Sequence, residues 1–152
     1  MEHFTFSADQ LNSNDANLLA KAREALKDAY APYSNFRVGA ACILDSGEII
    51  KGSNMENASY PLCLCAERTA LAAVHAMHQH KKVLSMAITA QSQAKKLQAP
   101  ISPCGACRQV ILEFEQKQQQ EIKIILQGEE GPVVIFNSIK ELLPMSFDGK
   151  VL

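Results

Sequence analysis

The order of helix-like and strand-like segments constrains the fold of this 152-residue chain more than any other feature. Apolar residues recur at three- and four-residue steps between Ala8 and Ala29, which predicts an opening helix. The segments predicted next are 36–44 (strand), 48–52 (strand), 65–79 (helix), 83–90 (strand) and 104–117 (helix). Because helices and strands alternate, we expect a layered α/β domain with parallel neighbouring strands in the middle of the chain.

Two short connections indicate how other strands pair. Asp45-Ser46-Gly47 separates the first two predicted strands and has the composition of a hairpin turn. The last two predicted strands cover 122–126 and 133–136, so only residues 127–132 connect them. A parallel pair needs a crossover of about a dozen residues or more. We therefore expect the last two strands to be antiparallel.

Length and charge exclude several classes of protein. A chain of 152 residues is about one domain long, so we expect a single domain over residues 1–152. The 15 Lys and Arg residues nearly balance the 16 Asp and Glu residues. A nucleic-acid partner would normally need a concentrated basic surface, which the sequence lacks. No apolar run is long enough for a membrane span, and no secretory signal is apparent at the N-terminus.

The cysteines indicate a metal site. Five cysteines in a chain without an export signal predict reduced thiols in the cytoplasm, where clusters usually bind metal or take part in catalysis. Cys104-Gly105-Ala106-Cys107 follows Pro103 and places two thiolates on one face at a helix start. That spacing suits zinc, and a redox pair is its main rival. The redox interpretation leaves Cys65, at the start of another helix, without a role.

Glu67 adds an acid to this predicted site. The helices that begin near Cys65 and Cys104 both follow strands, so their starts should meet at the carboxyl edge of the sheet. Within a helix, side chains 65 and 67 would point about 200° apart, but at the tip both can face a metal beyond the helix end. Glu67 could then move protons to and from a zinc-bound water. The alternative is an acid that only complements the helix dipole.

Several separated motifs resemble a known family. Cys65-Ala66-Glu67 followed by residues 103–107 (PCGAC) is similar to the motif of zinc-dependent nucleoside deaminases in its three-cysteine form. Segments 32–36 (PYSNF), 54–58 (NMENA) and 65–69 (CAERT) resemble more closely the small homotetrameric cytidine deaminases, from about residue 17 to the C-terminus. The resemblance implies a three-layer fold with a mixed five-stranded sheet flanked by helices, the last two strands antiparallel.

The resemblance also implies residue roles. Three cysteines, Cys65, Cys104 and Cys107, would hold one Zn²⁺ per subunit. Zinc-bound hydroxide would attack C4 of cytidine or deoxycytidine while Glu67 transfers protons, giving uridine or deoxyuridine and ammonia in pyrimidine salvage. The implied substrate contacts are the Ala66 backbone N–H, Asn54, Glu56, Phe36 and, from a neighbouring subunit, Phe147. Without the resemblance, the two aromatics would be ordinary core or surface residues and the two polar side chains turn residues.

The net charge of the predicted zinc site suggests a role for Arg68. Zn²⁺ with three thiolates carries a net charge of about −1, and added negative charge makes bound water harder to ionise. Arg68 could donate to the thiolates and offset part of this charge, as the resemblance suggests. A solvated helix arginine is the alternative.

Other assignments stay open from the sequence. A closed four-cysteine zinc site with Cys63 as the fourth ligand would make the chain an interaction module, although a one-residue gap between Cys63 and Cys65 is short for a zinc pair. A nearer alternative is deamination of another aminopyrimidine, such as a modified nucleoside or blasticidin S. We expect no metal at three histidines and an inert buried thiol at Cys42. The histidines are His75, His78 and His80.

Overall fold

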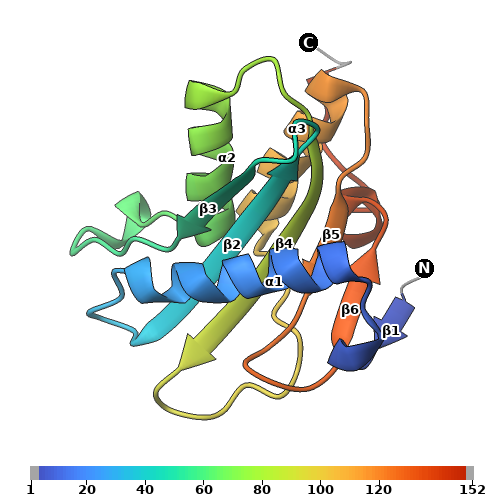
Figure 1. The fold of residues 1–152 in the computed structure, drawn as a ribbon. Helices are drawn as coiled ribbons and strands as arrows, with labels where there is room; N and C mark the ends of the chain where they lie inside the picture. Colours follow the sequence, from blue (N-terminus) through green and yellow to red (C-terminus); the bar gives the residue numbers. More distant parts are fainter. Residues whose placement is uncertain (1–3, 150–152) are drawn as a thin grey trace.

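The computed structural model describes residues 4–149, and a six-stranded mixed sheet forms its centre (Figure 1). The strands are β1 (Phe4–Phe6), β2 (Phe36–Leu44), β3 (Ile49–Ser53), β4 (Val83–Ser92), β5 (Lys123–Leu126) and β6 (Val133–Phe136), in the sheet order β1-β6-β5-β4-β2-β3. The α-helices are α1 (Ser13–Ala25), α2 (Ala66–Met77) and α3 (Gly105–Gln118). The named 3-10 helices of the described residues are η1 (Ala8–Gln10), η2 (Leu26–Asp28), η3 (Tyr60–Leu62) and η4 (Ile139–Leu142), the last of which follows β6.

The opening helix is shorter than the apolar pattern predicts. Its N-cap is Asn12, whose side-chain oxygen accepts a hydrogen bond from the Asp15 backbone N–H at 2.9 Å. Such a cap satisfies one of the free N–H groups of the first turn and defines where the α-helix begins. The flanking segments form η1 and η2 instead. The other two predicted helices agree with α2 and α3 to within two residues at each end.

The strand pairing confirms two expectations and corrects a third. Strands β5 and β6 are antiparallel, as their short connection requires, and β2 and β3 form the predicted hairpin. Parallel pairing, expected through the middle of the chain, occurs between β4 and β5, whereas β2 and β4 are antiparallel. The hairpin reverses the chain before the crossover through α2, so β4 runs in the same direction as β3 but pairs with β2.

The expected five-stranded sheet is also wrong by one strand. Strand β1 pairs antiparallel with β6, with Phe4 opposite Ile135 and Phe6 opposite Val133. The strand has only three residues and precedes the part of the chain that carries the family resemblance. A segment this short gives too little alternation for a strand to be predicted from pattern alone.

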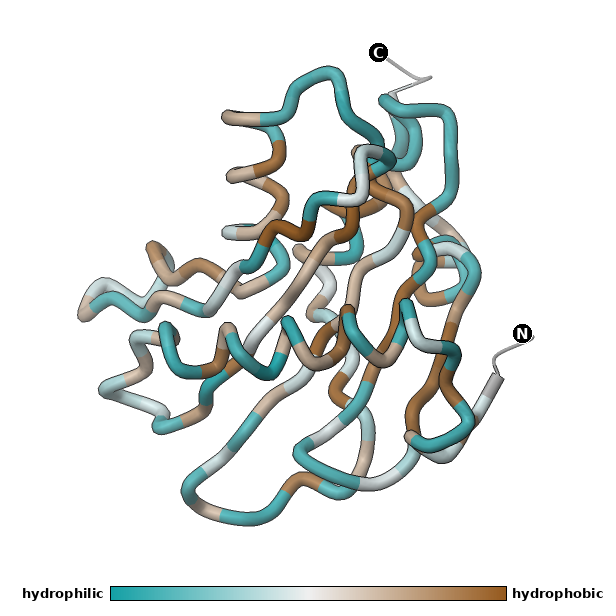
Figure 2. Tube along the Cα trace, viewed as in Figure 1, coloured by the Kyte–Doolittle hydropathy of each residue, from teal (hydrophilic) through white to brown (hydrophobic). Residues whose placement is uncertain are grey.

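Two clusters of buried side chains attach the helices to the two faces of the sheet. On one face α1 packs Leu18, Leu19 and Ala22 against Ala41 and Ala87. On the other face, Leu71 of α2 and Ile111 of α3 lie in one cluster with alternate residues of the same strands. These strand residues are Ala40, Cys42, Met86 and Ile88. Figure 2 shows the corresponding hydrophobic colour along the central strands. The sheet is therefore the middle of three layers.

Cys42 is fully buried in this second cluster, as expected. Burial raises the pKa of its thiol to about 12. A thiol protonated to such high pH is a poor nucleophile, and Cys42 is not part of a group of side chains that could hold a metal among residues 4–149.

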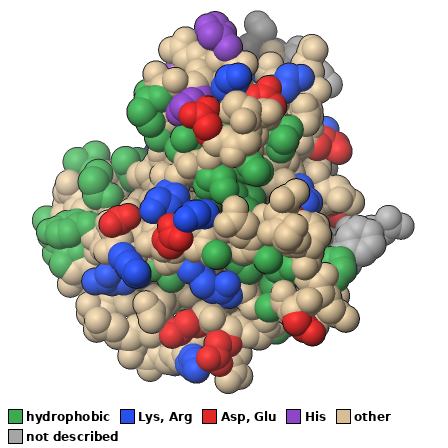
Figure 3. Space-filling model, in the orientation of Figure 1, with side chains coloured by type: hydrophobic (Ala, Val, Ile, Leu, Met, Phe, Trp, Pro, Cys, Tyr) green, Lys and Arg blue, Asp and Glu red, His purple; other side chains and the backbone are tan. Residues whose placement is uncertain are grey.

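Several large apolar side chains remain exposed. Figure 3 shows a group of hydrophobic side chains at the left of the molecule, over the segments that precede β2 and α2. Exposed residues of these segments are Tyr30, Tyr33, Met55, Tyr60 and Leu62. No helix within residues 4–149 has both the length and the apolar character needed to cross a membrane.

Candidate functional site

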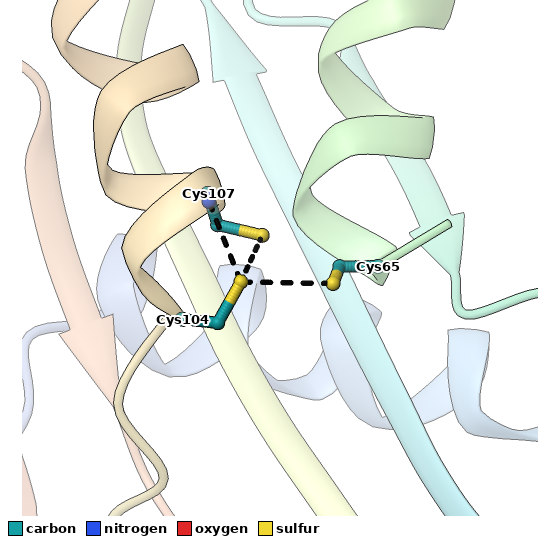
Figure 4. Close-up of side chains that lie close together, drawn as sticks. All are labelled: Cys65, Cys104 and Cys107. Atoms are coloured by element: carbon teal, nitrogen blue, oxygen red, sulfur yellow. Dashed lines mark hydrogen bonds between the residues drawn. The ribbon is translucent and has the colours of Figure 1, made fainter. Parts of the chain in front are cut away.

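The starts of α2 and α3 bring three cysteines together. Cys65 is the N-cap of α2, Cys104 is the N-cap of α3, and Cys107 lies in the first turn of α3. Because β3 and β4 run in the same direction, the helices that follow them begin at the same edge of the sheet, as predicted. Figure 4 shows the three sulfur atoms directed toward one another from the two helices.

The sulfur positions fit a zinc ion. The Sγ atoms of Cys65 and Cys104 are 3.8 Å apart, and those of Cys104 and Cys107 are 3.5 Å apart. All three Sγ atoms lie within 4.8 Å of one another. Ligand sulfurs about 2.3 Å from a tetrahedral zinc are about 3.8 Å apart, so the two resolved separations are close to this value. Among residues 4–149, this is the only group of three or more such side chains close enough to hold a metal.

The pKa values of the Cys65 and Cys107 thiols are shifted in opposite directions. Hydrogen bonding from the Cys107 thiol, helped by Cys104 and the positive charge of Arg68, lowers the pKa of Cys65 to about 6. Donation to Cys65, together with burial, raises the pKa of Cys107. Three sulfurs this close favour one thiolate that accepts hydrogen bonds from the others. A bound cation would favour the thiolate form of all three.

Glu67 is the second residue of α2 and is almost fully buried, with 4% of its surface exposed. Burial raises the pKa of its carboxyl group, and hydrogen bonds from its own backbone N–H and from the Cys107 side chain partly oppose this effect. Ala66, between Cys65 and Glu67, has no exposed surface. A buried acid with a raised pKa at the edge of a thiolate cluster is suited to carry protons near neutral pH.

A hollow of about 280 Å³ lies beside the cysteines, here called the site hollow. Its lining includes six residues predicted from the sequence: Phe36, Asn54, Glu56, Cys65, Glu67 and Cys104. Cys63, the alternative fourth zinc ligand, also lines it, and five further lining residues were not predicted from the sequence: Val38, Leu64, Ile88, Ile101 and Ser102. Leu64, Ile101 and Ser102 adjoin the cysteine motifs in sequence, which could have indicated them. Val38 and Ile88 come from strands, and only the sheet pairing brings them to the site.

Asn54 and Glu56 organise the wall of the site hollow. The side-chain oxygen of Asn54 accepts from the Val38 N–H at 2.8 Å, and its amide donates to the Phe36 carbonyl at 2.9 Å. The Glu56 carboxylate accepts from the Tyr33 N–H at 2.8 Å, from the Ser34 N–H at 3.2 Å and from the Ser34 hydroxyl. Each side chain therefore holds the backbone of a neighbouring segment at the wall.

The remaining predicted site residues lie outside the lining of the site hollow. Ala66 is buried behind it, and Arg68 is partly buried in the first turn of α2, where its charge acts on Cys65. Phe147 is 61% exposed, and its backbone carbonyl accepts from Gln109 at 2.9 Å. Up to residue 149, no aromatic side chain of the C-terminal segment lines the hollow of its own chain.

Cys63 does not join the sulfur cluster. Its Sγ accepts from the Asn57 N–H at 3.3 Å and donates to the Asn57 carbonyl at 3.7 Å, so it closes the loop between β3 and α2. The four-cysteine interpretation is therefore not supported by the geometry. The three histidines His75, His78 and His80 line a separate hollow at the far ends of α2 and α3 and form no metal-binding group among the described residues.

Comparisons with known proteins agree with this arrangement. Residues 12–120 match the family model described as the cytidine and deoxycytidylate deaminase zinc-binding region. A cytidine deaminase of Halalkalibacterium halodurans is 39% identical over 88% of this chain and 93% of its own length. One from Sporosarcina psychrophila is 43% identical over 64% of this chain and 67% of its own. The crystal structure of cytidine deaminase from Burkholderia pseudomallei has 38% sequence identity and a TM-score of 0.76, and the match covers 90% of this chain and all of that one.

Proposed function

The chain belongs to the family of zinc-binding cytidine and deoxycytidylate deaminases, and from that premise we propose that it hydrolyses cytidine and deoxycytidine to uridine and deoxyuridine, releasing ammonia. The observation that carries the proposal is a buried carboxylate, Glu67, at the wall of a hollow that also exposes two of three clustered cysteines. We place this hydrolase in pyrimidine salvage in the cytoplasm, with residues 1–152 as one catalytic domain. Five free cysteines are in keeping with a reducing compartment.

The proposed chemistry divides between the metal and the chain. Cys65, Cys104 and Cys107 would hold the zinc, which when bound would supply Lewis acidity for the attack of water on C4 of the pyrimidine. Glu67 would accept a proton from the attacking water and deliver it to N3 of the ring. It would then take the remaining proton of the new C4 hydroxyl group and deliver it to the departing amine, so that two protons are accepted and two are delivered. Its burial keeps bulk water away from these transfers. The Ala66 backbone N–H would donate to the ring, since it belongs to the first residue of α2, where N–H groups have no partner within the helix.

The wall of the site hollow supplies contacts for the sugar and the base. The Asn54 amide uses one N–H and one lone pair on β2, which leaves one of each for a ribose hydroxyl. The Glu56 carboxylate would accept from a second hydroxyl, and its negative charge would oppose a 5′-phosphate. The Phe36 ring would pack against the nucleoside. A nucleoside rather than a nucleotide is therefore the proposed substrate.

We also propose a homotetramer. The proposal is supported by a group of large apolar side chains that would be exposed to water in a monomer. These residues are Tyr30, Tyr33, Met55, Tyr60 and Leu62. The exposed Phe147 lies in the C-terminal segment and does not line its own site hollow. In the tetramer, Phe147 would enter the site hollow of a neighbouring subunit.

Turnover and metal content measured on one sample test the function. Absorbance should report deamination of cytidine and deoxycytidine, with little or no turnover of cytosine or deoxycytidine monophosphate, by protein that holds one zinc per chain. Glu67→Gln should keep its zinc and lose roughly 10²- to 10⁴-fold in turnover, because it cannot transfer protons. Zinc-loaded wild-type protein that leaves both nucleosides unchanged would contradict the proposal.

A further inference from the structure

Arg108 makes three hydrogen bonds beside the cysteine cluster, and nothing in the proposed chemistry uses it. It follows Cys107 in α3 and is partly buried. Its Nε donates to the Pro103 carbonyl at 2.8 Å, one terminal nitrogen donates to the Leu142 carbonyl at 2.8 Å, and the other donates to the Ser102 hydroxyl at 3.3 Å. The planar guanidinium thus bonds two segments that are far apart in sequence.

All three acceptors are neutral. No carboxylate within residues 4–149 forms an ion pair with Arg108, in contrast to five lysines that do pair with acids. Hydrogen bonds from a charged donor are stronger than neutral ones. The three hydrogen bonds of this cation therefore all connect one loop to its anchor.

The loop that Arg108 holds ends at a zinc ligand. The Pro103 carbonyl belongs to the peptide that directly precedes Cys104, so the Nε bond restrains the rotation of that peptide. Cys104 is the exposed member of the three cysteines, whereas Cys107 is fully buried. The surrounding packing therefore restrains Cys107, whereas the position of Cys104 depends more on the backbone before it.

The second segment provides the anchor. Leu142 is the last residue of η4, which the buried Glu115 of α3 fixes by accepting from the Ile139 N–H at 3.1 Å and the Ser138 hydroxyl at 2.8 Å. Arg108 thus connects the loop of Cys104 to a rigid part of the molecule. We propose that Arg108 is a positioning residue that holds Cys104 in the ligand set and so slows the loss of the metal. The inference rests on the proposed zinc site.

The test is the rate at which zinc leaves the folded protein. Zinc-loaded wild type, Arg108→Ala and Arg108→Lys are mixed with excess chromogenic chelator, and release is followed by absorbance. Arg108→Ala should release zinc roughly 10-fold faster, the lower end of the effect of removing an outer-shell partner. Arg108→Lys keeps the charge and can donate to one carbonyl, so its rate should lie between the two. Because Arg108 does not line the site hollow, kcat of Arg108→Ala should fall while KM changes less than about twofold.

Arg37→Ala is the matched control. Arg37 also donates to a backbone carbonyl, that of Leu26 at 3.4 Å, but it lines a different hollow, beside Gln91, that contains no cysteine. It should release zinc at the wild-type rate. Wild-type release from Arg108→Ala, or equal acceleration in Arg37→Ala, would overturn the inference. If Arg108→Ala does not fold, Arg108→Lys carries the test, and wild-type release from that variant overturns it.

The release assay requires no substrate, so it separates the two proposals. A wild-type protein that holds zinc but fails to deaminate cytidine counts against the proposed function, and the comparison of release rates still decides the role of Arg108.

Discussion

Cys63 and Cys65 are one residue apart and have different partners. Cys65 caps α2 and faces Cys104 at 3.8 Å, whereas the thiol of Cys63 bonds the backbone of Asn57. The difference arises because η3 ends immediately before Cys63, while Cys65 already lies at the tip of the helix. A sequence motif with two close cysteines therefore contains one ligand and one loop residue.

This difference predicts unequal effects of two serine substitutions. Cys63→Ser should bind one zinc per chain and keep its turnover, because a hydroxyl can make both hydrogen bonds to Asn57. Cys65→Ser should lose zinc, because a hydroxyl is a poor zinc ligand. Metal analysis after dialysis against a weak chelator measures both. Loss of zinc from Cys63→Ser would instead support the four-cysteine zinc site, with Cys63 as the fourth ligand.

Glu56 predicts a pH dependence of stability. Hydrogen bonding, first from the Ser34 hydroxyl and then from the Tyr33 and Ser34 amides, lowers the pKa of Glu56 below its ordinary value of 4.5. Because the folded-state pKa is lower than the unfolded one, the ionised carboxylate stabilises the fold above pH 4.5, and this contribution is lost as pH falls through the folded pKa. Wild type should therefore unfold at a higher temperature than Glu56→Gln at pH 6, with the difference shrinking toward pH 3.

Thermal unfolding of both proteins between pH 3 and pH 6 measures this effect. Glu113→Gln is the control, since Glu113 is an exposed acid of α3 with no hydrogen-bond partner among residues 4–149. Its difference from wild type should not depend on pH in this range. A constant difference between wild type and Glu56→Gln would show that the carboxylate hydrogen bonds do not stabilise the loop.

At the scale of elements, the placement of α2 depends on a close approach to β3. A Cβ atom on Gly52 would lie 2.4 Å from the Ala66 carbonyl oxygen and 2.4 Å from the Ala70 nitrogen, both backbone atoms of the first turns of α2. The Thr69 hydroxyl lies within 2.9 Å of the Ser53 carbonyl, its acceptor one residue along β3. The N-terminal end of α2, which carries Cys65 and Glu67, therefore packs directly against the backbone of β3.

Gly52→Ala should disturb the site through this contact. The backbone atoms cannot move aside as a flexible side chain could, so we expect a loss of about 3 kcal/mol in unfolding free energy, faster zinc release and lower turnover. Gly47→Ala is the control, because Gly47 has a φ of +86° but no atom within 4 Å of its added Cβ. It should lose only about 1–2 kcal/mol and keep its activity. Urea denaturation and turnover of both variants decide between these outcomes.

The elements that could be predicted are those whose signal is local. The turn at residues 45–47 and the short connection at 127–132 specify their antiparallel pairs without reference to the rest of the chain. The pairing of β2 with β4 depends on which side of β2 the chain reaches after the α2 crossover, which no local pattern encodes. Strand β1 gains its partner only when β6 is in place.

The same distinction applies to the site. Cys65, Glu67, Cys104 and Cys107 could be predicted because they lie at helix starts, where the backbone itself directs side chains and charge to one point. Ile88 and Val38 could not, because ordinary apolar strand residues become part of the site hollow only through the sheet. Arg108 lay beside a recognised motif, but its function depends on Leu142, which is distant in sequence.

At the scale of the whole molecule, the exposed Phe147 raises the question of which site it serves. It is 61% exposed and does not line the site hollow of its own chain. If it enters the hollow of a neighbouring subunit, Phe147→Ala should raise KM about tenfold through the lost aromatic contact and leave zinc binding unchanged. The same arrangement predicts that two defective chains can restore each other's activity.

Mixed oligomers of Phe147→Ala and Glu67→Gln subunits test this arrangement. With equal random mixing, about a quarter of the sites combine an intact Glu67 with an intact Phe147 from the neighbour. At substrate concentrations below KM, the mixture should therefore show about a quarter of the wild-type kcat/KM. If Phe147 acts only within its own chain, no site contains both residues, and only the weak activity of the Phe147→Ala subunits remains, about a twentieth of wild type under the same tenfold KM effect. Unmixed samples of each variant, treated identically, are the controls, and light scattering should give a mass near four times 16.7 kDa for every sample.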